Sequence, residues 1–168
     1  MKKMGIFYGS TTGTTENVAG VIAEKLGISQ EDIYNVATTR VEVVDGYDLL
    51  ILGSSTWGVG ELQDDWYDFL DGLKKKNLSG KRVALFGCGD STSFGSSFCD
   101  ALGIIHGELQ GSGCQFIGAV EDQGYAYEAS AALVDGQFVG LPLDDGNEGH
   151  LTEARVDAWI GSLQGALH

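Results

Sequence analysis

The sequence is short of positive charge. Its 168 residues include ten Lys and Arg against 24 Asp and Glu, which gives a formal net charge of −14. A chain this acidic repels nucleic acids and anionic membranes, so neither is expected as a partner. It should instead attract basic protein surfaces. Acidic residues also keep proteins soluble, but solubility explains a few excess acids more readily than fourteen.

Cysteine, histidine and long apolar runs are scarce as well. Three cysteines, an odd number without metal-ligand spacing, are interpreted as reduced thiols, two of them buried, and the three histidines lie far apart in the sequence. No run approaches the roughly 18 apolar residues of a membrane span, and the first residues lack the apolar region of a signal peptide. We therefore expect a cytoplasmic protein with a single domain over residues 1–168.

What the chain does contain is an alternation of strand-like and helix-like segments. Apolar runs of strand length lie at 4–8, 48–52, 82–86 and 115–120, with a weaker one at 32–36. Most do not alternate with polar residues, which indicates strands buried on both faces. Apolar side chains recur at helical spacing in segments 18–26, 62–73, 98–109 and 156–163. This pattern predicts an α/β domain with a parallel sheet of about five strands and helices on both faces.

One interval breaks the alternation. Residues 121–137 are mostly polar or small, and Phe138–Leu143 then resumes a strand-like run. We interpret residues 121–137, approximately, as an insertion that interrupts the last strand, with Phe138–Leu143 completing it.

The most informative stretch follows the first apolar run. Gly9 is followed by six residues that are all hydroxylic or glycine, and a helical pattern begins directly after them: Ser10, Thr11, Thr12, Gly13, Thr14 and Thr15. A strand, a hydroxyl-rich loop and a helix N-terminus together favour anion binding. No Lys or Arg lies between Gly9 and Lys25, and neither the dinucleotide fingerprint nor the P-loop motif is present, which favours a single phosphate monoester. An ordinary capped turn fits the same residues equally well.

Two further loops should lie on the same edge of the sheet, because ligands of such folds bind beyond the carboxyl ends of parallel strands. One is 53–61 and the other 87–95, and each carries a single large aromatic residue, Trp57 or Phe94, among small ones. Two aromatic rings above a phosphate site could stack on both faces of a flat ring system. A planar heterocycle with one phosphate is FMN.

These loops resemble those of flavodoxins of the long-chain type. Residues 10–15 are similar to the phosphate motif (S/T)-x-T-G-x-T, and residues 55–58 and 87–90 resemble the loops on the two flavin faces. Segments around 124–125, 136–141 and 151–152 resemble those that accompany the insertion in the fifth strand. The resemblance covers nearly the whole chain and implies a doubly wound sheet of order 2-1-3-4-5.

The resemblance also implies which residues bind FMN. Residues 10–15 would hold the phosphate, Trp57 the inner ring face and Phe94, where the family usually has Tyr, the outer face. Backbone groups of the second and third loops would address the ring edge, Ser97 and Cys99 would flank the pyrimidine, and Asp145 is a weak candidate near the ribityl chain. The complete expected set is Ser10, Thr11, Thr12, Gly13, Thr14, Thr15, Ser55, Thr56, Trp57, Gly58, Val59, Gly60, Cys88, Gly89, Asp90, Phe94, Ser97, Cys99 and Asp145.

The function implied is one-electron transfer by non-covalent FMN cycling between semiquinone and hydroquinone, with no catalytic residue and no metal. The absence of basic residues in the three loops and the acids Glu61, Asp64, Asp65 and Asp90 predict a low semiquinone/hydroquinone potential. Acids at 61, 64, 65, 68 and 71 would steer basic redox partners, a reductase and acceptor enzymes, to a monomeric carrier.

Other functions remain open at this point. An FMN-dependent NAD(P)H:quinone reductase of the same fold is the main alternative, although the loops offer no basic residues for a dinucleotide. A phospho-receiver module would need acidic residues where Gly9-Ser10 and Gly53-Ser54 stand. A domain without a ligand would leave Trp57 and Phe94 unexplained.

Overall fold

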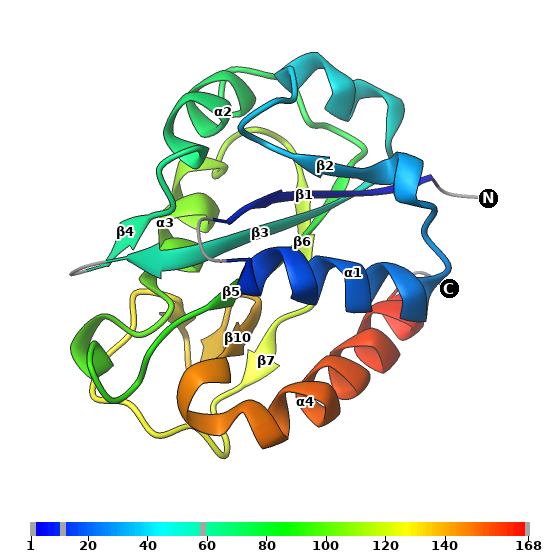
Figure 1. The fold of residues 1–168 in the computed structure, drawn as a ribbon. Coiled ribbons are helices and arrows are strands. Elements are labelled where there is room, and N and C mark those ends of the chain that lie inside the picture. Colours follow the sequence, from blue (N-terminus) through cyan, green and yellow to red (C-terminus); the bar gives the residue numbers. More distant parts are fainter. Residues whose placement is uncertain (1–2, 11–12, 58–59, 167–168) are drawn as a thin grey trace.

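A computed structural model describes residues 3–10, 13–57 and 60–166 of the chain (Figure 1). Its central sheet is parallel, in the order β10-β5-β3-β1-β2, which confirms the expected order 2-1-3-4-5. The strands are β1 (Met4–Gly9), β2 (Ile33–Asn35), β3 (Leu49–Trp57), β5 (Arg82–Cys88) and β10 (Leu141–Leu143).

Helices cover both faces of this sheet, as predicted (Figure 1). On one face lie α1 (Thr14–Leu26) and α4 (Asp145–Ala166), which is kinked at Glu148. On the other lie α2 (Trp66–Leu73) and α3 (Asp100–Glu108). Short 3-10 helices, η1 (Gln30–Asp32), η2 (Val41–Gly46) and η3 (Gly95–Ser97), complete the connections.

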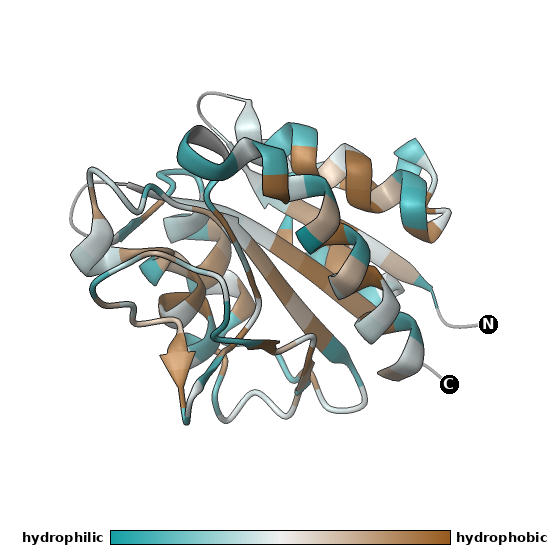
Figure 2. Cartoon of the chain, turned by 90° about the horizontal axis from the view of Figure 1, so that it is seen from below, coloured by the Kyte–Doolittle hydropathy of each residue, from teal (hydrophilic) through white to brown (hydrophobic). Residues whose placement is uncertain are grey.

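The sheet buries side chains on both faces. Along β3, Leu49 and Ile51 pack into the cluster that holds α1 and α4, whereas Leu50 and Leu52 pack into the cluster that holds α2 and α3. The central strands accordingly form the brown, hydrophobic layer of Figure 2, beneath helices that mix brown and teal residues. The aromatic residues on the predicted helical stripes, including Trp66 and Trp159, are buried core residues. Continuous apolar runs were thus a correct sign of two-sided burial.

The fifth strand is divided into two pieces, as expected, but the interruption is longer than 121–137. The first piece is β6 (Gln115–Ile117), which pairs with the start of β5, and the second is β10, which pairs with its end. Between them lie 118–140, which form a small antiparallel sheet of β7 (Val120–Glu121), β8 (Leu133–Val134) and β9 (Gln137–Phe138). Phe138 therefore belongs to the insertion, and only Leu141–Leu143 completes the strand.

The turn between β8 and β9 explains this boundary. Asp135 and Gly136 both have positive φ, 53° and 83°, the conformation that two-residue hairpin turns require. The Asp-Gly pair was visible in the sequence, and it joins Leu133–Val134 to Gln137–Phe138 as a hairpin.

The second predicted loop also begins later than expected. β3 continues through Ser55 to Trp57 because it pairs with β5 as far as Cys88 and then with β4 (Glu61–Leu62), which runs antiparallel to it. Gly60 closes this hairpin with φ of 91°, and a Cβ there would lie 2.6 Å from Oδ2 of Asp100. A residue other than glycine is therefore strained at this position.

Two findings concern membrane spans and metal clusters among the described residues. No helix in the described ranges is long and apolar enough to cross a membrane. The described residues also hold no group of three or more His, Cys, Asp and Glu side chains that could bind a metal ion. The three cysteines are free, with Cys88 and Cys99 buried and Cys114 half-buried, as predicted.

Candidate cofactor site

The three loops singled out in the sequence meet at one edge of the sheet. Gly9 at the end of β1 pairs with Ser54 of β3, which pairs with Gly87 of β5, so the three strands end side by side. A hydrogen bond of 2.6 Å between Oγ1 of Thr15 and Oγ of Ser55 joins the start of α1 to the end of β3. Because both hydroxyls are buried, this bond fixes the first two loops relative to each other.

The first loop leads into the N-terminus of α1. Gly13 is the N-cap residue, with φ of 93°, and no side chain of a described residue caps the helix. The amide of Gly13 donates instead to Oγ of Ser10, at 3.0 Å. Amides of a first helical turn lack intrahelical acceptors, so an uncapped N-terminus presents free donors to an anion. Ser10, Gly13 and Thr14 are half-buried there, whereas Thr11 and Thr12 lie outside the described residues.

The second loop is partly occupied by structural bonds. Oγ1 of Thr56 accepts a hydrogen bond of 3.0 Å from the amide of Ala101, in the first turn of α3. The hydroxyl of Thr56 therefore caps α3, a role that the sequence pattern did not reveal. Gly58 and Val59 lie outside the described residues, as does the side chain of Trp57, so their expected roles stay predictions.

The third loop is a tight turn organised by Asp90. Oδ1 of Asp90 accepts from the amides of Ser93 at 2.9 Å and Thr92 at 3.1 Å, and its carbonyl accepts from the amide of Phe94 at 2.9 Å. The amide of Ser93 and, after it, the side chain of Asn147 hold the pKa of Asp90 below its usual range. The turn presents Phe94 outward, with 43% of its surface exposed.

Two neighbouring backbone amides of the third loop differ in whether they already have a hydrogen-bond acceptor within the protein. The amide of Gly89 donates to the carbonyl of Leu143 at 2.8 Å, which extends the pairing of β5 with β10. The amide of Asp90 has no acceptor in the part of the chain that the structure describes. A Cβ on Gly89 would lie 2.9 Å from the amide nitrogen and the sulfur of Cys99, so this glycine is required by packing within the protein.

Three predicted residues lie below the loop surface. Cys88, Ser97 and Cys99 are all buried. The sulfur of Cys99 lies 3.9 Å from the carbonyl oxygens of Gly87 and Leu143, and burial raises the pKa of its thiol well above the usual value. These side chains support the loop from beneath, and their expected contacts with a ring remain predictions.

The site includes two residues that the sequence pattern did not identify. Asp144, fully buried after β10, accepts hydrogen bonds from Ser91, and Asn147, in the first turn of α4, contacts both Asp90 and Asp144. The only sequence signal was the position of Asp144 directly after the last strand. Asp145, the predicted neighbour, begins α4, and its side chain lies outside the described residues.

The chain was compared with known proteins. The family model described as Flavodoxin matches residues 6–159. Flavodoxin 1 of Azotobacter vinelandii is 45% identical over 168 residues, covering 98% of this chain and 97% of that protein. Flavodoxin 1 of Salmonella typhimurium is 43% identical over 165 residues, covering 98% and 94%. Among solved structures, Fusobacterium nucleatum flavodoxin bound to flavin mononucleotide superposes with a TM-score of 0.89 at 32% identity, covering 99% of both chains.

Proposed function

This chain belongs to the flavodoxin family, and from that premise we propose how its own residues serve an FMN-based electron carrier. Flavodoxins are electron-transfer proteins and not enzymes, and FMN supplies their reversible one-electron chemistry when it is bound. The alternative, an NAD(P)H:quinone reductase of the same fold, gains no support from the relatives. The observation that carries the proposal is that the N-terminus of α1, which begins at a glycine N-cap, and the loop with the exposed ring of Phe94 follow strands that end at the same sheet edge.

The phosphate end of FMN fits the first loop. Ser10, Gly13 and Thr14 border the start of α1, where free amides and the helix dipole favour an anion. The loop carries no basic side chain, so its capacity suits one phosphate rather than a polyphosphate. Thr11 and Thr12 belong to the same proposed set. Thr15 contributes from beneath, because its hydroxyl bonds to Ser55.

The ring end fits the other two loops. Phe94 leaves much of its ring open to solvent, and a flat heterocycle would cover it by stacking. We assign the opposite face to Trp57 and the neighbouring edge to backbone groups of Ser55–Gly60. The amide of Asp90, which has no acceptor among the described residues, is the proposed donor to a ring carbonyl. Cys88, Gly89, Ser97, Cys99 and Asp145 complete the proposed set.

The charges around this site favour a strongly reducing carrier. No Lys or Arg occurs in the three loops, residues 10–15, 53–61 and 87–95. Glu61 and Asp90 within the loops, and Asp144 next to the third loop, add carboxylates. Adding negative charge to such a site is opposed by about 0.5–1 kcal/mol for each carboxylate at intermediate distance. We therefore expect the lower of the two one-electron midpoint potentials to lie below that of free FMN. A spectroelectrochemical titration that places it above free FMN would contradict this account.

Partner proteins should approach along α2 and the hairpin before it. Glu61, Asp64 and Asp68 are exposed there, and none of them contacts a cation among the residues that the structure describes. Asp71 differs, because it pairs with Lys74 and Lys75. Three unpaired carboxylates near the ring end suit basic redox partners that dock transiently. The monomeric state and the cytoplasmic location of the carrier are likewise proposals.

A visible spectrum recorded through stepwise reduction tests the function. The purified protein should be yellow, and one-electron reduction should produce a long-wavelength band before full bleaching. Rapid oxidation of NADPH by the protein alone would favour a reductase instead. A colourless protein that does not take up added FMN would contradict the proposal outright.

A further inference from the structure

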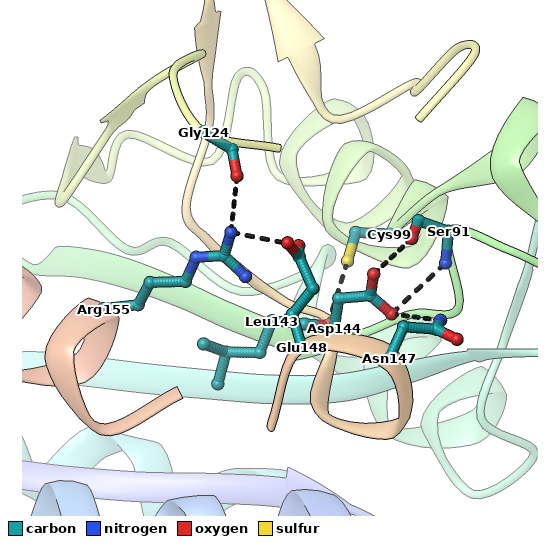
Figure 3. Close-up of polar contacts among 8 residues, drawn as sticks. All are labelled: Ser91, Cys99, Gly124, Leu143, Asp144, Asn147, Glu148 and Arg155. Carbon is teal, nitrogen blue, oxygen red and sulfur yellow. Dashed lines mark hydrogen bonds and ion pairs between the residues drawn. The ribbon is translucent and has the colours of Figure 1, made fainter. Parts of the chain in front are cut away.

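The loop that carries Asp90 and Phe94 is held from the side by residues more than 50 positions away. Asp144 is fully buried, and its Oδ1 accepts from the amide of Ser91 at 3.3 Å while its Oδ2 accepts from the Ser91 hydroxyl. These bonds join the turn of the third loop to the end of β10 (Figure 3). The internal bonds of Asp90 shape the turn, and Asp144 fixes where that turn stands.

Asn147 connects the two carboxylates. Its Nδ2 donates to Oδ1 of Asp90 at 2.8 Å and to Oδ1 of Asp144 at 2.7 Å, so both amide hydrogens are used. Carboxylates this close repel each other, and a shared donor offsets the repulsion. Figure 3 shows Asn147 and Asp144 side by side at the start of α4, facing Ser91.

The first turn of α4 is itself fixed from the opposite side. The amide of Glu148 donates to the carbonyl of Asp144 at 2.6 Å. Nη2 of Arg155 donates to Oε1 of Glu148 at 3.1 Å and to the carbonyl of Gly124, in the insertion, at 2.7 Å. Asp144 and Asn147 therefore stand on a backbone that is bonded to the insertion, and they contact the ring-binding loop from that support (Figure 3).

We propose that Asp144 and Asn147 are positioning residues that hold the Asp90–Phe94 turn in the form that accepts the flavin ring. The proposal rests on the function proposed above, since it concerns the ring end of the same site. Neither residue needs to touch the cofactor. Their bonds to Ser91 and Asp90 place the free amide of Asp90 and the ring of Phe94 before the ligand arrives, which lowers the entropy lost on binding.

Three substitutions perturb this set of bonds in different ways. N147A removes the shared donor, S91A removes the hydroxyl that bonds to Asp144, and D144N keeps the size of the side chain while removing its charge. N77A and D48N serve as controls of the same residue types, because each of these side chains accepts a bond from a backbone amide at an exposed position elsewhere in the protein, Asn77 from Ser79 and Asp48 from Lys3.

The readout is the dissociation constant of the full-length apoprotein for FMN and for riboflavin, measured by quenching of flavin fluorescence. Loss of one hydrogen bond to a charged group corresponds to about a tenfold change. N147A and S91A should weaken FMN and riboflavin by the same factor of about ten, because riboflavin has the same ring without the phosphate. D144N should weaken both by a smaller factor. The controls should bind both ligands as the unchanged protein does.

Three results would overturn the proposal. Unchanged affinity for both FMN and riboflavin in N147A and S91A would show that the turn needs no external support. Weakening of FMN alone would place the effect at the phosphate. General destabilisation would show itself in a third way. The loss of flavin affinity would then be matched by a lower thermal unfolding temperature of the apoprotein, and hydrogen exchange at the amides of Ser91–Ser93 would be no faster. If the unchanged protein binds no FMN, the proposed function fails first, so the two failures are distinguishable.

Discussion

At the scale of single residues, Phe94 is one of two exposed aromatic side chains among the described residues. Trp66, Trp159 and Phe98 are buried, whereas Phe94 leaves 43% of its surface exposed and Tyr67, on α2, leaves 50%. Of these two exposed side chains, only Phe94 lies in one of the three loops at the sheet edge. Its place on the sheet edge could be predicted from its glycine-rich loop. The bonds that orient the loop could not, because Asp144 and Asn147 follow it by 53 and 57 residues.

Replacing Phe94 tests whether its open ring serves the cofactor. F94A should weaken FMN binding about 10–100-fold, because a stacked aromatic pair and its buried area are lost. F94Y keeps the stacking area and should stay within about threefold of the unchanged protein. Fluorescence titration of the apoproteins gives both values. Equal affinities for F94A and the unchanged protein would remove Phe94 from the site.

At the scale of elements, the sequence pattern predicted the strands and helices themselves but not where the strands end. Strands, helices and their order follow from apolar runs and helical periodicity. β3 extends beyond its apolar run because Ser54 and Ser55 are buried by pairing with β5, and no local pattern marks such polar strand residues. The insertion is longer than predicted because Phe138 pairs within it, and its apolar character suggested the main sheet instead.

The insertion packs directly against α3 at Gly103. A Cβ at Gly103 would lie 2.3 Å from the carbonyl oxygen of Ala131, whereas a Cβ at Gly107, one turn later, would meet nothing within 4 Å. G103A should therefore lower the free energy of unfolding by about 1–3 kcal/mol through overpacking. G107A should raise it by about 0.5–1 kcal/mol, because alanine favours the helix.

Urea denaturation of both variants gives this comparison. The two changes add the same methyl group to the same helix, so their opposite signs separate packing from helix propensity. A stabilised G103A variant would show that the insertion can move away from α3 without loss.

Removing single acidic residues on α2 and the preceding hairpin should change the rate of electron transfer by different amounts. The changes E61Q, D64N and D68N should each slow electron transfer to a basic cytochrome c at low salt, because each removes an unpaired charge. D71N should change the rate little, because Lys74 and Lys75 already offset that carboxylate. Stopped-flow rates at increasing ionic strength provide the measurement, and the differences should vanish as salt rises. Rates that respond equally to D71N would contradict the assignment.

At the scale of the whole molecule, the negative net charge and the burial of tyrosines together affect stability at high pH. The chain carries a formal net charge of −14, and each ionised phenol adds to it. Burial, followed by the bond to Glu16, raises the pKa of Tyr8 to about 12. Burial also raises the pKa of Tyr125 and Tyr127 to about 12, and that of Tyr47 further still.

The folded protein should therefore lose stability in alkali. Because these folded pKa values lie above the ordinary value of 10.0, the folded state holds the phenolic protons more tightly than the unfolded state. The resulting stabilisation is complete below pH 10 and declines as pH rises towards 12. Urea midpoints at pH 8, 9.5 and 11 should fall with pH, and less steeply in Y8F. A constant midpoint up to pH 11 would disprove this linkage.

The fifth strand is continuous in the sheet but interrupted in the chain. β6 and β10 take consecutive places along β5, although 118–140 lie between them in the chain. If a protease cleaved the insertion, both fragments would keep strands that hydrogen-bond within the main sheet, because β6 and β10 each pair with β5. The smaller fragment would carry β10 and α4, and the larger one the other main strands, so the protein is suited to reassembly from two pieces and to new chain ends placed within the insertion.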